Sequence, residues 1–226
     1  MINLVKSQDY FDPTMLKNRR VHIIGCGSVG STIAELLARL GITKISLYDF
    51  DKVSAHNIAN QMFNESDIGR LKTDAVKDLI CAINKDAEPD IETFAEGYTD
   101  QTRLSGYIFL CVDNIDLRRE IVKKNQFNQS ILAMFDFRTR LEDAQHYAAN
   151  WKNALEVKSL LNSMDFTHEE AHAATPVTAC NVEMGVAPTV RIICSYGISN
   201  FMNFVRKNEL KKIILIDAFN FSIDVY

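Results

Sequence analysis

Apolar residues recur along the first fifty positions with the spacing of a strand, a helix and a second strand. Val21 to Ile24 is a short apolar run that predicts a strand. From Ser31 to Leu40 the apolar positions follow a helical period, and Lys44 to Tyr48 reads as a strand again. Such a strand–helix–strand unit of about 30 residues is the building block of a parallel sheet.

The rest of the chain continues this alternation. We expect helices over about 73–82, through Arg118 and Val122, and over 186–204; the expected strands are 91–95, 107–112, 130–135, 213–216 and 222–225. The stretch from about 152 to 175 is polar and predicts a crossover loop with some helix. The expected fold class is α/β, a Rossmann-like doubly wound, mainly parallel sheet with helices on both faces and short antiparallel C-terminal strands. We expect one domain over 1–226, with a nucleotide half of about 18–150 and a C-terminal part of about 151–226.

Composition places the chain among globular proteins and excludes several classes of function. Of 226 residues, 47% are hydrophobic and 24% are charged, and the net charge of −4 argues against a nucleic-acid partner, which needs a basic surface. No apolar run reaches the roughly 18 residues of a membrane span, so no membrane partner is expected. The first residues lack the pattern of a signal peptide, which makes the cytoplasm the default expectation.

A glycine-rich turn joins the first strand to the first helix: Gly25-Cys26-Gly27-Ser28-Val29-Gly30. In this motif the glycines permit a tight turn, a close approach of backbone to phosphate, and close packing of helix on strand. The free N–H groups of the helix N-terminus attract the anion. Asp49, at the end of the second strand, is placed to accept hydrogen bonds from ribose. The motif indicates a nucleotide and leaves NAD, FAD and ATP open.

Further motifs follow in a fixed order. They are Asp49-Phe50-Asp51-Lys52-Val53, Asn57-Ile58-Ala59-Asn60-Gln61, Asp67-Ile68-Gly69-Arg70-Leu71-Lys72, Cys111-Val112-Asp113-Asn114 with Arg118, and Cys180 with Gly185-Val186-Ala187-Pro188. This set, spread over about 20–204, resembles the ThiF/MoeB/HesA family, which is related to the ubiquitin-activating enzymes. The family resemblance changes the expected nucleotide from NAD to ATP.

The resemblance implies a reaction and its participants. Members use ATP and Mg²⁺ to adenylate the C-terminal carboxylate of a ubiquitin-like or sulfur-carrier protein, or of a peptide, and the acyl adenylate then passes to a thiol or sulfur donor. They commonly form homodimers, and the apolar run from Ile192 to Phe204 is a candidate face, although burial in its own core explains that run equally well.

The resemblance also assigns roles to residues. Lys72 is expected on the phosphates and Asp113 on Mg²⁺, which prefers hard oxygen ligands, although Asp113 also fits a helix cap. Asp49 is expected on ribose. Asn57 and Gln61 are candidates for ribose or phosphate, with turn formation as the rival explanation. The remaining nucleotide-binding candidates are Gly25, Gly27, Ser28, Gly30, Asp51, Asn60 and Asn114.

One departure from the family pattern bears on activity. The family's N-x-x-R-Q arginine, expected to stabilise negative charge during phosphoryl transfer, is replaced by Asn60. Arg70, Arg118 or an arginine of a partner subunit are candidate substitutes. The family's N-terminal R-Y-x-R-Q segment and paired C-x-x-C zinc ligands are also absent. The alternative function is therefore a non-catalytic, nucleotide-binding subunit or scaffold.

The five cysteines are odd in number and scattered, which argues against a disulfide framework. Cys26, Cys81, Cys111 and Cys194 are expected as buried or free thiols. Cys180 occupies the family position that carries thioester or sulfur chemistry in some members, and is therefore a catalytic candidate. Its sequence neighbours include no base or cation to lower its pKa.

A second motif competes with this interpretation. His168-Glu169-Glu170-Ala171-His172 matches H-E-x-x-H, in which two histidines one helical turn apart bind zinc and the glutamate acts as general base. A third ligand would come from Glu183, Glu209 or Asp217. A partly exposed acidic helix explains the same residues, so a zinc hydrolase stays a minor alternative, as does an NAD-dependent oxidoreductase.

Overall fold

The structure, a computed structural model, describes residues 2–173 and 184–226. Its centre is an eight-stranded sheet of order β3-β2-β1-β4-β5-β6-β7-β8. The five strands from β3 to β5 in this order pair in parallel, and the pairs from β5 to β8 are antiparallel. The strand bounds are β1 Val21–Ile24, β2 Ile45–Tyr48, β3 Glu92–Phe94, β4 Gly106–Leu110, β5 Ile131–Thr139, β6 Asp143–Asn150, β7 Ile213–Asp217 and β8 Ser222–Val225. The expected fold class is confirmed.

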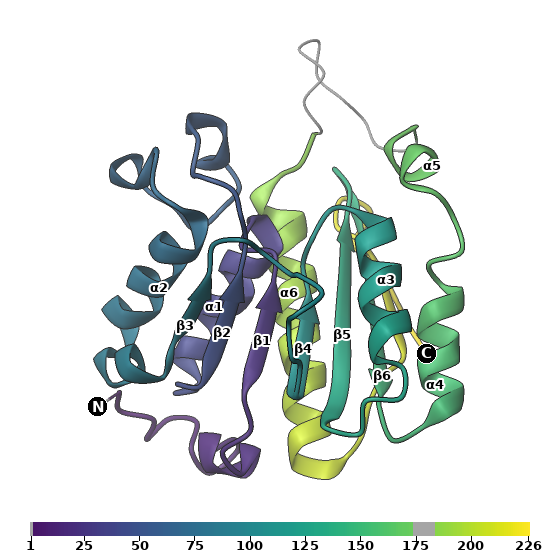
Figure 1. The fold of residues 1–226 in the computed structure, drawn as a ribbon, viewed down its shortest axis with the longest axis horizontal. Helices are drawn as coiled ribbons and strands as arrows, with labels where there is room; N and C mark the ends of the chain where they lie inside the picture. The colour runs from purple at the N-terminus through teal and green to yellow at the C-terminus, as the bar shows by residue number, and fades with distance from the viewer. Residues whose placement is uncertain (1, 174–183) are drawn as a thin grey trace.

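Helices cover both faces of the sheet (Figure 1). Helices α1, α2 and α6 contribute to one apolar cluster, and α3 and α4 contribute to a second cluster on the other face. The helix bounds are α1 Ser28–Arg39, α2 Lys72–Ile83, α3 Ile115–Asn125, α4 Ala154–Asn162, α5 His168–Ala173 and α6 Ala187–Lys207. Short 3-10 helices are η1 Pro13–Leu16, η2 Ala55–Asn57, η3 Glu65–Asp67 and η4 Lys85–Asp90.

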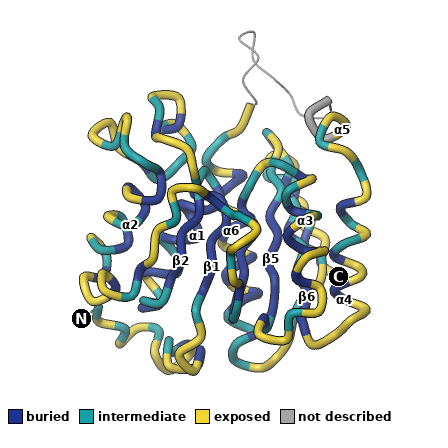
Figure 2. Tube along the Cα trace, viewed as in Figure 1, coloured by how far each residue is buried: buried dark blue, intermediate teal, exposed yellow. Residues whose placement is uncertain are grey.

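The core follows from the strand sequences. All four residues of β1 and of β2, and all five of β4, are buried, because helices cover both faces of the parallel part of the sheet. Figure 2 shows this buried centre with exposed loops around it. Phe201 of α6 packs against Phe109 and Phe135, with ring centroids 5.5 and 5.6 Å apart. The apolar run of α6 is thus largely core, while Ile192 and Tyr196 are exposed.

The structure corrects two of the expected elements. Helix α1 begins at Ser28 rather than Ser31, because Gly27 is its N-cap and the end of the glycine motif is already helical. Strand β5 continues past Phe135 to Thr139, and β6 was not predicted at all. The polar stretch of about 152–175 contains the two helices α4 and α5 within its described part, which fits the expected crossover with some helix.

Strand order reverses between β1 and β4. Helix α1 follows β1 onto one face, and α3 follows β4 onto the other, so the two connections leave the sheet in opposite directions. In open α/β sheets this leaves a crevice at the carboxyl ends of the strands, where ligands bind. Within the described part of the chain, no helix is long and apolar enough to cross a membrane.

Candidate functional site

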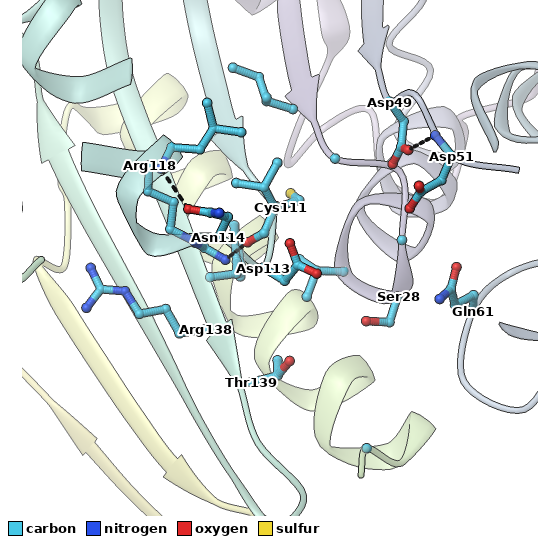
Figure 3. Close-up of a pocket in the computed structure, with 18 of the residues that line it drawn as sticks. Ser28, Asp49, Asp51, Gln61, Cys111, Asp113, Asn114, Arg118, Arg138 and Thr139 are labelled. Atoms are coloured by element: carbon cyan, nitrogen blue, oxygen red, sulfur yellow. Dashed lines mark hydrogen bonds between the residues drawn. The ribbon is translucent and has the colours of Figure 1, made fainter. Parts of the chain in front are cut away.

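A cavity of about 810 Å³ opens at the carboxyl ends of β1, β2, β4 and β5. This volume lies within the usual range for small-molecule sites, roughly 300–1,000 Å³. We call it the sheet-edge cavity. Figure 3 shows Asp113 between Ser28 and Gln61 on one side and Arg118 and Arg138 on the other. The candidates Gly25, Gly27, Ser28, Asp49, Asp51, Asn57, Asn60, Gln61, Lys72, Asp113 and Asn114 all line it.

The glycine-rich turn owes its shape to two positions where a side chain does not fit. Gly25 has φ +94°, and a Cβ there would lie 2.8 Å from backbone atoms of Cys111 and Val112. A Cβ on Gly30 would lie 1.8 Å from the carbonyl oxygen of Gly25, so Gly30 packs the helix on the turn without lining the cavity. Gly27, by contrast, has no atom within 4 Å of such a Cβ. Its backbone therefore faces open space, as close approach by a ligand requires.

Asp49 ties the two strand ends together. Its carboxylate accepts hydrogen bonds from the backbone N–H of Cys26 at 2.6 Å and of Asp51 at 2.8 Å. Burial raises the pKa of Asp49, and these two backbone hydrogen bonds oppose that rise. Each carboxylate oxygen can accept more than one hydrogen bond, so the group can serve the turn and a ligand hydroxyl together.

Lys72 is the first residue of α2 and is buried, with 8% of its surface exposed. Its Nζ lies 2.8 Å from Asp51 Oδ2, and its backbone N–H donates to the carbonyl of Asp51. The amine therefore lies at the cavity wall rather than in bulk solvent.

Asp113 and Asn114 follow β4, and only Asn114 caps the next helix. Asn114 is the N-cap of α3, and its Oδ1 accepts from the N–H of Leu117 at 3.0 Å. The helix cap proposed for Asp113 is thus wrong. Asp113 is exposed, and no described group donates a hydrogen bond to its carboxylate. Its oxygens can therefore take a cation.

The loop after β2 carries the three amide candidates. Asn57 closes a capping box, with its Oδ1 accepting from the N–H and hydroxyl of Ser54, so turn formation accounts for this residue. The Oε1 of Gln61 is buried and has no described hydrogen-bond partner. A buried acceptor without a donor costs free energy unless a ligand or water supplies one. Asn60 lies beside Gly185, whose added Cβ would be 3.4 Å from Asn60 Nδ2.

Two arginines of the cavity share one buried carboxylate. Arg118, 5% exposed, forms an ion pair with Asp136 and donates to the carbonyls of Leu110 and Val112. Arg138 Nε lies 2.8 Å from the other oxygen of Asp136, which is fully buried. The guanidinium of Arg118 is therefore held by contacts within the fold rather than free to bind a ligand. The other suggested substitute, Arg70, pairs with Asp67 and Asp78 and does not line the cavity.

Several cavity residues were not anticipated from the sequence. Arg138 and Thr139 end β5, Arg140 follows it, and Phe166 lies just before α5. For the residues at the end of β5, the available signal was a run of polar residues after a buried strand, the same signal that singled out Asp49 and Asp113.

The thiols in the described part of the chain are free. Cys26, Cys111 and Cys194 are buried, and burial raises the pKa of each, as expected for inert core thiols. Cys81 is half-buried. These four agree with the expectation from the sequence. Cys180 lies outside the described residues.

The H-E-x-x-H motif begins at the first residue of α5, and the structure describes the side chains of His168 and Glu169. His168 lines the sheet-edge cavity, and its Nδ1 is buried with no described partner. Glu169 is exposed. Over 2–173 and 184–226, no group of three or more His, Cys, Asp or Glu side chains is arranged to hold a metal ion. Of the suggested third ligands, Glu183 lies outside the described residues.

A glycine-rich turn and a polar cavity at the point where strand order reverses define the class of doubly wound α/β proteins that bind ligands at the sheet edge. The family model described as "ThiF family" matches residues 9–223. The chain belongs to the ThiF family, which confirms the resemblance drawn from its motifs.

Curated relatives match only in part. "Ubiquitin-like modifier-activating enzyme 5" of Caenorhabditis briggsae is 30% identical over 133 residues, 52% of this chain and 31% of the relative. The Arabidopsis thaliana protein of the same name is 32% identical over 120 residues, 45% of this chain and 28% of the relative. The chain thus spans about a third of the length of these relatives.

Solved structures agree on the fold. The crystal structure of PaaA has a TM-score of 0.68 and 19% identity, and it covers 95% of this chain and 65% of its own. The crystal structure of E. coli MccB with ATP has a TM-score of 0.66 and 20% identity, with the same two coverages. At these identities the likeness concerns the fold alone.

Proposed function

We propose that this chain activates the C-terminal carboxylate of a ubiquitin-like or sulfur-carrier protein, or of a peptide, by adenylation with Mg-ATP. The observation that carries the proposal is the meeting of Asp49, Lys72 and Asp113 beside the glycine-rich turn in one cavity. These residues come from three separate segments, and each has the chemistry that one part of ATP requires. The solved MccB structure with ATP, which has the same fold, supports the choice of nucleotide.

The reaction brings two anions together. A carboxylate oxygen attacks the α-phosphorus of ATP, the bond from that phosphorus to the bridging oxygen breaks, and pyrophosphate leaves with the electron pair. Positive charge and N–H donors must offset the repulsion. Lys72 supplies a positive charge at the cavity wall. The first residues of α1, whose N–H groups have no partner within the helix, directly follow the glycine-rich turn. Asp49 would accept hydrogen bonds from the ribose hydroxyls. Gln61 Oε1 would accept a hydrogen bond from the ligand, since it has no described donor.

The residues present fit Mg²⁺ at one position. Asp113 offers a hard carboxylate oxygen in the cavity, with no described donor occupying it. Magnesium sites on nucleotides commonly use one or two carboxylates together with phosphate oxygens. When bound, the ion would reduce the negative charge of the phosphates.

The substrate class follows from the names of the relatives and remains part of the proposal. Four of the similar solved structures are of MccB with forms of MccA, and the curated relatives are named for a ubiquitin-like modifier. A homodimer through the exposed residues of α6 and a role for Cys180 as sulfur or thioester carrier belong to the same proposal.

The test is ATP–pyrophosphate exchange with small proteins and peptides ending in Gly-Gly, run beside a titration of Mg-ATP. Exchange that is lost in Lys72→Ala and Asp113→Ala, with Lys77→Ala as a control on the same helix, would support adenylation. Failure to bind Mg-ATP would sink the proposal. Preference for NAD over ATP would favour an oxidoreductase, and stoichiometric zinc in the purified protein would favour a hydrolase.

Asn60 favours a second function, a nucleotide-binding subunit or scaffold without the adenylation step. The family arginine is absent at this position, and both sequence-based substitutes in this chain are held in ion pairs. Tight Mg-ATP binding with no exchange over a broad set of carboxylate partners would support this reading. Exchange with any partner would contradict it.

A further inference from the structure

We propose that Arg140 supplies to the ATP phosphates the positive charge that family members place at the position of Asn60. The inference rests on the proposed function, since it assigns one more residue to the same site. Arg140 lies directly after β5, on the turn to β6, and lines the sheet-edge cavity. No sequence motif pointed to it.

The charges lining the cavity show why another cation is required. Its carboxylates are Asp49, Asp51, Glu96, Asp113 and Asp143, and its Lys and Arg side chains are Lys72, Arg118, Arg138 and Arg140. Two of those cations are held by a buried carboxylate, and a third pairs with a half-exposed one. Lys72 pairs with Asp51, and Arg118 and Arg138 share the fully buried Asp136. Bringing polyphosphate and a carboxylate into this space adds several more negative charges.

Arg140 differs from the other two cavity arginines in how it is held. Its guanidinium lies 4.0 Å from Asp143, and both side chains are almost half exposed. Exposed pairs of this kind contribute little free energy, whereas removing a partner from a buried pair is costly. Arg138 is also fixed by Ser163, which accepts from its guanidinium at 2.7 and 2.9 Å. Among the cavity arginines, Arg140 alone can change partner at little cost.

A short segment connects Arg140 to the position of the missing arginine. Gly185 lies beside Asn60, and four residues later the hydroxyl of Thr189 donates to the carbonyl of Leu141 at 2.8 Å. Thr189 is fully buried, so this contact fixes the β5–β6 turn against the start of α6. Four residues of chain reach at most about 14 Å. The side chain of Asn60 lies beside one end of the segment Gly185–Thr189, and the turn that carries Arg140 is hydrogen-bonded to its other end.

The chemistry of arginine suits this role. The planar guanidinium presents several N–H donors and binds phosphate oxygens through two parallel hydrogen bonds. Released from Asp143, the side chain would meet the phosphates from the end of β5, whereas Lys72 lies at the start of α2. The polyphosphate would then lie between two cations that belong to different segments of the chain.

The experiment is calorimetric titration of the intact chain with Mg-ATP and, separately, with adenosine. Arg140→Ala is expected to weaken Mg-ATP roughly 10- to 100-fold, the effect of losing a charge-assisted hydrogen bond, and to leave adenosine unchanged. Arg140→Gln gives a second variant of similar length. Arg39→Ala, which removes an exposed partner of Glu35 on α1, is the control and should bind both ligands normally. Asn60→Arg in the Arg140→Ala background should restore most of the Mg-ATP affinity.

The outcomes separate this inference from the proposed function. If the unaltered chain binds Mg-ATP and both Arg140 variants bind it equally well, the inference is overturned while the proposed function stands. If Asn60→Arg does not restore Mg-ATP affinity in the Arg140→Ala background, the inference that Arg140 takes the place of the family arginine is overturned. If the unaltered chain binds no Mg-ATP, both fail.

Discussion

The amine of Lys72 lies 2.8 Å from the carboxylate of Asp51, and both residues line the sheet-edge cavity. A second link joins the same residues through the backbone, where Lys72 N–H donates to the carbonyl of Asp51 at 3.0 Å. The lysine is thus preorganised at the end of β2 before any ligand arrives. Asp51 is half exposed, so its hold on the amine is weak enough to yield to a phosphate.

Replacing Lys72 with methionine should therefore weaken Mg-ATP roughly 10- to 100-fold, because a charge-assisted contact is lost. Adenosine should bind as before. Lys77→Met, on the same helix but outside the cavity lining, is the matched control. Calorimetry measures both ligands, and an unchanged Mg-ATP affinity in Lys72→Met would contradict the assignment.

Most of the fold could be predicted because its signals are local. The apolar strand β1 leads through Gly25 into the helical period of α1, and β4 leads through Asp113 and Asn114 into that of α3, so these elements can be read directly from the sequence. Strand β6 was not predicted because its buried side chains include Ala144, His146 and Ala148 rather than large aliphatic residues. The continuation of β5 escaped because Asp136 looks like the end of a strand.

Candidate site residues could be predicted where a local sequence motif marks them. They could not be predicted where their position depends on a contact between segments far apart in the sequence. Asp49 and Asp113 lie in one cavity because each follows a parallel strand and the strand ends meet at the same edge of the sheet, whereas Lys72, at the start of α2, was assigned by the family motif. By contrast, the commitment of Arg118 depends on Asp136, eighteen residues away, and only the parallel pairing of β4 with β5 brings them together. The place of Arg140 depends in the same way on Thr189.

Asp136 is the shared partner of two arginines, and its loss should destabilise the fold. Asp136→Asn would leave Arg118 buried with an uncompensated charge, which costs about 3–5 kcal/mol. Urea unfolding measures the change. Asp116→Asn removes the exposed partner of Arg119 and should cost at most about 0.5 kcal/mol. Equal free energies of unfolding for the two variants would show that Asp136 does not stabilise the fold through its two arginine partners.

The glycines of the turn should differ in what they tolerate. Gly30→Ala places a Cβ 1.8 Å from the carbonyl oxygen of Gly25, so backbone must move, and we expect a loss of about 3 kcal/mol. Gly27→Ala meets no atom within 4 Å and changes only an N-cap residue, which costs about 1 kcal/mol or less. Thermal and urea unfolding compare the two. The reverse order of stabilities would refute this account of the turn.

Two buried histidines should make stability depend on pH. Burial lowers the pKa of His22 and of His146 to about 4 from an ordinary 6.5. His146 Nδ1 lies 3.1 Å from the carbonyl of Asp136, and Nε2 faces the amide nitrogen of Asn200 at 3.1 Å. In the neutral ring with the proton on Nδ1, Nε2 accepts from Asn200, and a second proton would abolish that bond.

Because each folded-state pKa lies below the unfolded value, the unfolded chain binds more protons between pH 6.5 and about 4. The histidine contribution to stability is therefore fully present above pH 6.5 and is lost as the pH falls toward 4. Between pH 7 and 5 each histidine should remove on the order of 1–2 kcal/mol. Urea unfolding at pH 7, 6 and 5 should show a shallower pH dependence for His146→Gln than for the unaltered chain. The exposed His56 supplies the control: His56→Gln should retain the full slope, and a full slope in His146→Gln would remove His146 as its source.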